Sequence, residues 1–214
     1  MTLRQYFDEK LEAIRSDVLR MGGIASDMVR LAVDATLNGD TALAERVIQM
    51  DDEVDRLDKE TVHATVFMVM RESPVASDLL LLVSVLGVIG EIEKVADDAV
   101  KLARRATKLT GHFPGEMKVA LSRLGDLAGT SFASALRLVS NYDASLASQV
   151  IRGDKQIDGE YVEARNAVFK LIQANPNETE HLVRTIEAFH ALEHVADHSV
   201  EIASRLQLHY QGEV

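Results

Sequence analysis

The 214-residue sequence contains no cysteine and only three prolines. The absence of cysteine excludes disulfide bonds, thiolate zinc sites and cysteine nucleophiles, and it fits a reducing compartment. No basic, apolar segment precedes the polar start of the chain, which argues against a secretory signal peptide. The most apolar stretch, residues 79–90, is too short to cross a bilayer and predicts a buried helix segment. We expect residues 79–82 to be fully buried, in the fold or in a dimer contact.

The sequence also lacks an excess of positive charge. It has 23 lysines and arginines against 34 aspartates and glutamates, which gives a formal net charge of −11. This balance disfavours nucleic acid and anionic lipid as partners. The sequence has no glycine-rich phosphate loop of the Walker type and no serine with an evident histidine partner. These absences agree with a protein that is not an enzyme.

Helical periodicity dominates what is present. Apolar residues recur at helical spacing over long stretches, and no strand-like alternation interrupts them. The prolines, Pro74, Pro114 and Pro176, fall where this pattern stops. Asp40 and Asp143 are each placed to cap the start of a helix. We predict six helices, at residues 4–38, 41–72, 75–110, 117–141, 144–174 and 177–210.

The helical pattern occurs twice. Residues 40–55 align without a gap with residues 143–158, and residues 91–100 align with residues 191–200. A twofold repeat in a chain of this length favours two small helical units over one large one. The predicted fold is all-α, with two tandem pseudo-symmetric three-helix bundles. We place the first repeat at residues 1–110, a linker at 111–116 and the second repeat at 117–214.

Each repeat carries four carboxylates at matching positions. They are Asp51, Asp55, Glu93 and Asp97 in the first repeat and Asp154, Asp158, Glu193 and Asp197 in the second. The two acids on each helix are four residues apart and therefore share one face. Each acid on the first of these helices has a counterpart on the second helix that lies equally far along the chain from the proline between them, to within one residue. Because such residues lie side by side in an antiparallel hairpin, the four acids of each repeat should converge.

Four carboxylates that converge near an apolar face repel one another and lose hydration. A cation must offset them, but no lysine or arginine recurs in both repeats, since Lys94 is matched by His194. Carboxylate oxygens suit hard cations such as Mg, Mn, Fe or Ca. The sequence therefore predicts two carboxylate metal sites. The alternative is a metal-free helical scaffold in which all eight acids face water.

A second alternative is a ferritin-like di-iron oxidase or iron store. Such bundles hold iron through Glu-x-x-His motifs on two helices. That spacing occurs at Glu60/His63, Glu178/His181 and Glu187/His190. The three pairs are not equivalent in the repeat, since Glu187 corresponds to Gly87. Charge-rich helices produce this spacing by chance, so we prefer the carboxylate sites.

Several motifs resemble those of the PhoU family of phosphate-uptake regulators. They are Asp-x-x-x-Asp after an Asn-Gly-Asp cap, Ser-Pro-Val-Ala-Ser-Asp-Leu at 73–79, and Glu-x-x-x-Asp in EIEKVADDAV and LEHVADHSVEIA. The opening FDEKLEAIRSDVLRMGGIASD is also similar to that family's first helix. The resemblance spans essentially the whole chain. It implies two pseudo-symmetric three-helix bundles, commonly dimeric, with multinuclear metal clusters in some members.

Carried onto this sequence, the resemblance makes all eight acids metal ligands. Iron is the first candidate, with Zn, Mn, Mg or Ca as the others. The sequence departs from the family pattern where Asp98 stands opposite His198 and where Lys101 stands opposite Glu201 in the repeat. We therefore expect the two sites to differ in affinity or nuclearity, with His198 as a candidate contact of the ligands.

The resemblance also implies a function. Similar proteins act at the cytoplasmic face of the membrane, where they restrain phosphate uptake and signalling. Their partners are a high-affinity phosphate ABC transporter, through its ATPase subunit, and the sensor histidine kinase of the phosphate-starvation response. We expect a cytoplasmic, non-catalytic, homodimeric adaptor that reaches the membrane only through its partners. Related domains also accompany low-affinity phosphate carriers, so the client transporter is left open.

Overall fold

In the computed structural model, residues 3–109 and 111–211 are described. These residues form six long α-helices and two short 3-10 helices, and they contain no β-strand. The elements are α1 (Leu3–Asn38), α2 (Thr41–Glu72), α3 (Ala76–Leu109), η1 (Gly115–Met117), α4 (Lys118–Ser140), α5 (Ala144–Ala174), η2 (Pro176–Glu178) and α6 (Thr179–Gln211). The predicted all-α fold with six helices is confirmed. Residue 110, the predicted end of the third helix, lies outside the described residues.

Side-chain caps fix where the outer helix of each repeat begins. Asp40 accepts a hydrogen bond from the backbone N–H of Leu43 at 2.9 Å, and Asp143 accepts one from Leu146 at 2.7 Å. Each bond satisfies an N–H group that the first helical turn leaves unpaired. Both predicted N-caps are therefore confirmed. The sixth helix starts two residues later than predicted because η2, which begins at Pro176, occupies that turn.

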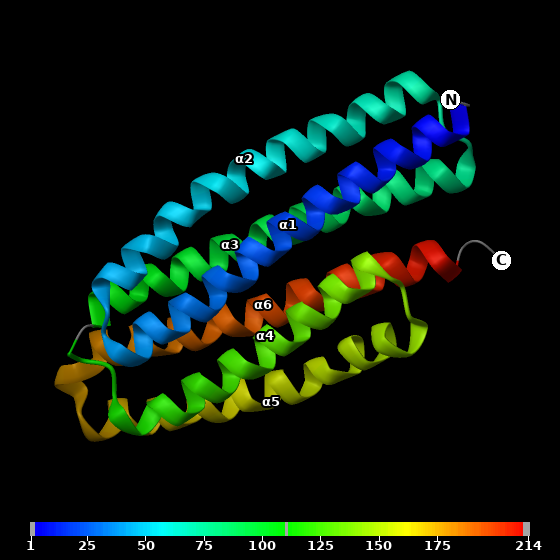
Figure 1. Cartoon of the computed structure of the whole chain (residues 1–214). Coiled ribbons are helices and arrows are strands. Elements are labelled where there is room, and N and C mark those ends of the chain that lie inside the picture. Colours follow the sequence, from blue (N-terminus) through cyan, green and yellow to red (C-terminus); the bar gives the residue numbers. More distant parts are fainter. Residues whose placement is uncertain (1–2, 110, 212–214) are drawn as a thin grey trace.

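The six helices form two three-helix bundles that pack along their lengths. Figure 1 shows α2 and α5 at opposite outer edges, with α1, α3, α4 and α6 between them. The inner helices α3 and α6 run antiparallel and make the largest contact between the repeats, and α1 packs against α4. Among the described residues, no helix combines the length and apolarity needed to cross a membrane.

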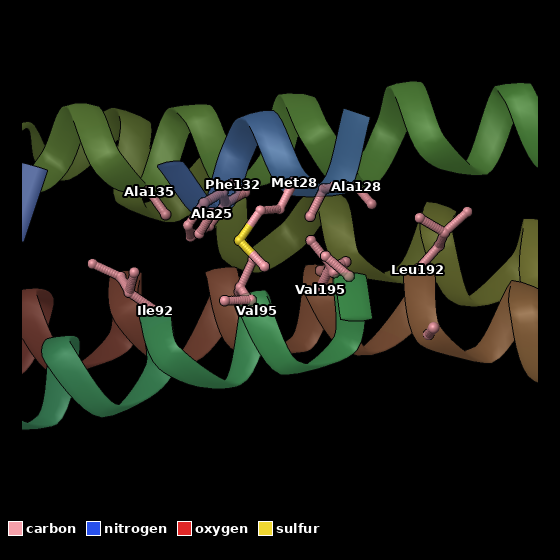
Figure 2. Packing of buried hydrophobic residues seen from close by; sticks show 14 of the residues in the cluster. Ala25, Met28, Ile92, Val95, Ala128, Phe132, Ala135, Leu192 and Val195 are labelled. Carbon is pink, nitrogen blue, oxygen red and sulfur yellow. The ribbon is translucent and has the colours of Figure 1, made fainter. Parts of the chain in front are cut away.

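One hydrophobic core joins the two repeats. Figure 2 shows Met28 of α1 beside Val95 of α3, with Phe132 of α4 and Val195 of α6 completing the layer. Met28 and Phe132 are fully buried. A methyl group added at Gly22 would lie 2.3 Å from Leu136 Cδ2, so the glycine permits the close approach of α1 and α4. The repeats are thus held together by packed side chains across four helices.

Residues 79–82 are not all buried inside the fold of the single chain, and their burial in a dimer contact stays a prediction. Leu82 is buried, whereas Leu79 and Leu80 are exposed. Consecutive residues of a helix point in directions about 100° apart. Four in a row therefore surround the helix, and they can all be buried only where neighbours enclose it completely. Near its start α3 is covered on one side only, so Leu79 and Leu80 remain exposed.

Candidate metal centres

The eight predicted acids lie in two places. In the first repeat, Asp51 and Asp55 lie on α2 and face the α3 acids. In the second repeat, the acids of α5 face those of α6. Each set therefore sits between an outer helix and the inner helix that packs against it. These are the positions that hairpin geometry predicts.

The second set converges closely. Asp154, Asp158 and Asp197 each offer a carboxylate oxygen within 4.8 Å of the other two. Glu193 lies one turn before Asp197. Burial first, and then the charges of Asp197, Asp158 and Asp154, raise the pKa of Glu193 to about 7. Burial and the charges of Asp158 and Asp197 also raise the pKa of Asp154. The four acids thus form one electrostatic unit.

Two oxygens of the second set have no hydrogen-bond donor. Asp154 Oδ1 and Glu193 Oε2 are buried, and neither accepts a hydrogen bond from the described residues. A buried carboxylate oxygen without a donor costs free energy. A hard cation would supply the missing partner and would offset the repulsion between the acids. The residues of the second set therefore fit a bound metal ion.

Histidines extend the second set. His190, Glu193 and His194 offer ligand atoms within 4.8 Å of one another. Burial, and then the charge of His194, lower the pKa of His190, which favours the neutral imidazole that binds metals. His194 is the repeat counterpart of Lys94, and from its sequence position we expect it on the surface. The structure instead places it beside the acids, so the second set offers nitrogen as well as oxygen donors, a combination that also suits Zn²⁺.

The first set is looser. Burial, followed by the charges of Asp55 and Asp97, raises the pKa of Asp51. Burial, followed by the charge of Asp97, also raises the pKa of Glu93. The four acids are therefore neighbours, as predicted. However, within the described ranges no three of them bring ligand atoms within 4.8 Å of one another.

The first repeat supplies part of its own counter-charge. Lys59 Nζ lies 3.1 Å from Asp55 Oδ2, and Arg104 partly offsets Asp51. The counterparts of these two cations in the second repeat are Val162 and Ser204. The second set is tighter, and its own basic neighbours include Arg165, which partly offsets Glu193, and His194, which partly offsets Asp197. The two sets differ in geometry and in their basic neighbours, and among the described residues only the second has buried carboxylate oxygens without a hydrogen-bond partner.

A buried polar network joins the repeats between α3 and α6. Glu91 and Asp98 of α3 are only 3% and 1% exposed. They lie on either side of His198 of α6, whose Nδ1 is 2.9 Å from Glu91 Oε2 and whose Nε2 is 3.3 Å from Asp98 Oδ2. Arg205 Nη2 donates to Glu91 at 3.1 Å, and Lys101 Nζ donates to Asp98 at 2.8 Å. Both buried acids therefore contact His198 of α6. Glu91 has Arg205 of α6 as a further basic partner, and Asp98 has Lys101 of its own helix.

Hydrogen bonds decide the charges in this network. Burial opposes ionisation, but the hydrogen bonds of His198 and Lys101 hold the pKa of Asp98 below its ordinary value. Burial likewise opposes the imidazolium, but bonds to Asp98 and Glu91 raise the pKa of His198. Both ring nitrogens of His198 are therefore engaged with α3 rather than with the metal-site acids. Asp98 and His198 occupy equivalent positions in the two repeats, and in the folded chain they are partners.

The Glu-x-x-His pairs do not assemble a di-iron centre in the part of the chain that the structure describes. Arg56 neutralises Glu60 at 2.7 Å, and Arg105 Nε lies 2.6 Å from Glu187. His63 is exposed on α2 and stacks on Phe67. The three pairs lie in three separate places rather than facing one another. A ferritin-like centre needs two such motifs directed at the same ions.

Comparison with known proteins gives a consistent result. The family model for the PhoU domain matches residues 18–106 and 121–206. A "Phosphate-specific transport system accessory protein PhoU homolog" from Pseudomonas putida is 32% identical over 203 residues, which are 94% of this chain and 79% of that protein. The crystal structure of PhoU from Pseudomonas aeruginosa has a TM-score of 0.93 at 30% identity, covering 96% of this chain and 99% of that one. The phosphate transport system regulatory protein PhoU from Streptococcus pneumoniae has a TM-score of 0.88 at 21% identity, covering 96% and 97%, which supports the fold alone.

Proposed function

Because the chain belongs to the PhoU family, we propose that it is a non-catalytic regulatory accessory protein of phosphate transport. The observation that carries this proposal is similarity over nearly the whole length to relatives named for that role. Both repeats take part in the match. We place its action at the cytoplasmic face of the membrane, where it restrains phosphate uptake and the phosphate-starvation response.

We further propose that the two sets of acids hold metal ions. Asp154, Asp158, Glu193 and Asp197 would hold the tighter site and Asp51, Asp55, Glu93 and Asp97 the weaker one. The unpaired buried oxygens and the closer convergence of the second set support this order. Iron is the ion that we expect first, and the histidines beside Glu193 would also accept Zn²⁺. A bound ion supplies positive charge that lets the acids fix α5 against α6 and α2 against α3.

The protein partners in this proposal are the ATPase subunit of a phosphate ABC transporter and a sensor histidine kinase. Apolar burial contributes to protein association, and contiguous exposed apolar side chains mark candidate contact surfaces. Exposed apolar side chains gather at the hairpin between α2 and α3, where Met70 is 76% exposed and Phe67 and Val75 are also exposed. We assign this end to protein contact, either with a transport partner or with a second copy of the chain.

Gene deletion tests the regulatory role. We expect the deletion to switch on phosphate-starvation outputs in phosphate-rich medium and the wild-type gene to restore repression. Repression that persists without the gene would refute the proposal. Co-purification from native membranes, read by mass spectrometry, should recover the transporter ATPase and the kinase. Phe67→Glu/Met70→Glu should reduce this recovery, whereas Val119→Glu, which changes an exposed valine of α4, should not.

Metal content tests the two acid sets separately. Protein purified without chelator is compared with Asp154→Ala/Asp197→Ala and Asp51→Ala/Asp97→Ala variants. We expect the first variant to lose the more tightly held metal and the second to lose the more weakly held metal. Equal metal content in all three proteins would instead favour the metal-free scaffold.

A further inference from the structure

A third group of potential metal ligands lies outside both acid sets, where the linker between the repeats meets the start of α6. His112 belongs to the linker, Glu178 to η2 and His181 to the first turn of α6. Each offers a ligand atom within 4.8 Å of the other two. The imidazole rings of His112 and His181 lie face to face, with centroids 4.1 Å apart and planes within 3° of parallel, so one ring must turn for both to direct a nitrogen at one ion. The Glu178/His181 pair therefore gains a third ligand from a distant part of the chain.

The backbone holds these side chains in position. Gly111 has a φ of 76°, in the left-handed region that favours glycine, and this conformation turns the chain at the end of α3. The N–H groups of His112 and Phe113 then donate to the carbonyl of Leu109 at 2.8 and 3.0 Å. Phe113 packs edge-on against Phe189 of α6. The linker is thus fixed at both the α3 and the α6 side, which limits the freedom of His112.

One ring nitrogen of the cluster has no hydrogen-bond partner. His181 Nδ1 is buried, and it has no hydrogen-bond partner among the described residues. His112 and Glu178 are exposed and line a cleft of about 150 Å³ that opens to solvent. The nearby ends of α3 and α5 carry partial negative charge, which together with Glu178 offsets the positive end of α6. A cation can therefore reach the cluster from solvent without strong repulsion.

We infer that His112, Glu178 and His181 form a binding site for a divalent transition metal that prefers nitrogen ligands, with Zn²⁺ as the first candidate. Two imidazoles and one carboxylate are a zinc donor set, and the open cleft leaves room for water as the fourth ligand. This set differs from the oxygen-rich acid sets, and the inference does not depend on the proposed function. A bound ion would tie the linker between the repeats to the start of α6.

Zinc binding to the full-length, chelator-treated protein tests the inference. We expect His112→Ala and His181→Ala each to remove one equivalent of tightly bound Zn²⁺ in calorimetric titrations, and Glu178→Gln to weaken that equivalent by roughly tenfold or more. Two matched controls should bind as the wild type does. Glu116→Gln removes a carboxylate of the same cleft that is not in the cluster, and His63→Ala removes an exposed histidine of α2.

Two further readouts guard against a misfolded variant. At about 100 times the Kd, Zn²⁺ should raise the Tm of the wild type by roughly 5 °C, and neither histidine variant should retain this full rise. Co²⁺ should give an intense four-coordinate visible spectrum in the wild type and in Asp154→Ala/Asp197→Ala, but a weaker one in the histidine variants. Unchanged zinc stoichiometry and Tm rise in both histidine variants, with their helical circular dichroism intact, would overturn the inference. Persistence of the Co²⁺ signal in the acid variant separates this site from the proposed regulatory metals.

Discussion

A Glu193→Gln substitution should stabilise the metal-free protein at neutral pH and leave its stability nearly unchanged in acid. Burial first, and then the charges of Asp197, Asp158 and Asp154, raise the pKa of Glu193 from its ordinary value of 4.5 to about 7. The side chain is only 18% exposed, so solvent screens these charges weakly. Glutamine has the size of the protonated glutamate but never acquires its charge.

The sign follows from where the proton binds more tightly. Because the pKa in the folded protein lies above that in the unfolded chain, the folded protein holds the proton more strongly. The stability that this provides is present below about pH 4.5 and is lost as the pH rises toward 7. The loss is on the order of 3 kcal/mol, at about 1.4 kcal/mol for each tenfold change in proton affinity. Glu193→Gln should not lose this free energy of unfolding as the pH rises, because glutamine does not ionise.

Urea unfolding followed by circular dichroism, in EDTA and at several pH values, measures the effect. The free energy of unfolding of Glu193→Gln minus that of the wild type should rise from near zero at about pH 4.5 to on the order of 3 kcal/mol at about pH 8. Glu163→Gln, which changes an exposed acid of α5, should show a difference that does not vary with pH. With saturating metal the sign should reverse, because the variant then lacks a ligand. A difference for Glu193→Gln that is flat across this pH range would refute the electrostatic reasoning.

Two further changes test the network between the repeats and the helix caps. Asp98→Ala removes a buried partner of His198 and should lower the free energy of unfolding by about 3–5 kcal/mol, whereas loss of the exposed Lys59 should cost about 1 kcal/mol or less in the same urea titration. A cost for Asp98→Ala as small as that for Lys59→Ala would contradict the assigned role. Asp40→Ala and Asp143→Ala remove equivalent caps and should each cost about 1 kcal/mol, adding in the double variant because the caps are far apart. A large cost for only one of them would show that the two caps are not equivalent in energy.

Most of the fold and the placement of the eight acids could be predicted because they depend on local rules. Helix starts follow from caps such as Asp40, and helix ends follow from prolines. The convergence of Asp154, Asp158 and Asp197 follows from i,i+4 spacing and from the length of one hairpin. Both rules act within a single repeat. The resemblance to the PhoU family rested on the same local motifs, and the comparisons confirmed it.

What the sequence by itself determined was therefore the content of each repeat: three helices, their caps and one cluster of acids. Only the tertiary structure decided how the repeats meet. Packing α3 antiparallel against α6 turns Asp98 and His198 from repeat equivalents into partners, and it places Arg205 beside Glu91. The same packing brings His112 of the linker onto His181. These contacts join residues far apart in the chain, and their register depends on the whole interface, so no local pattern could specify them.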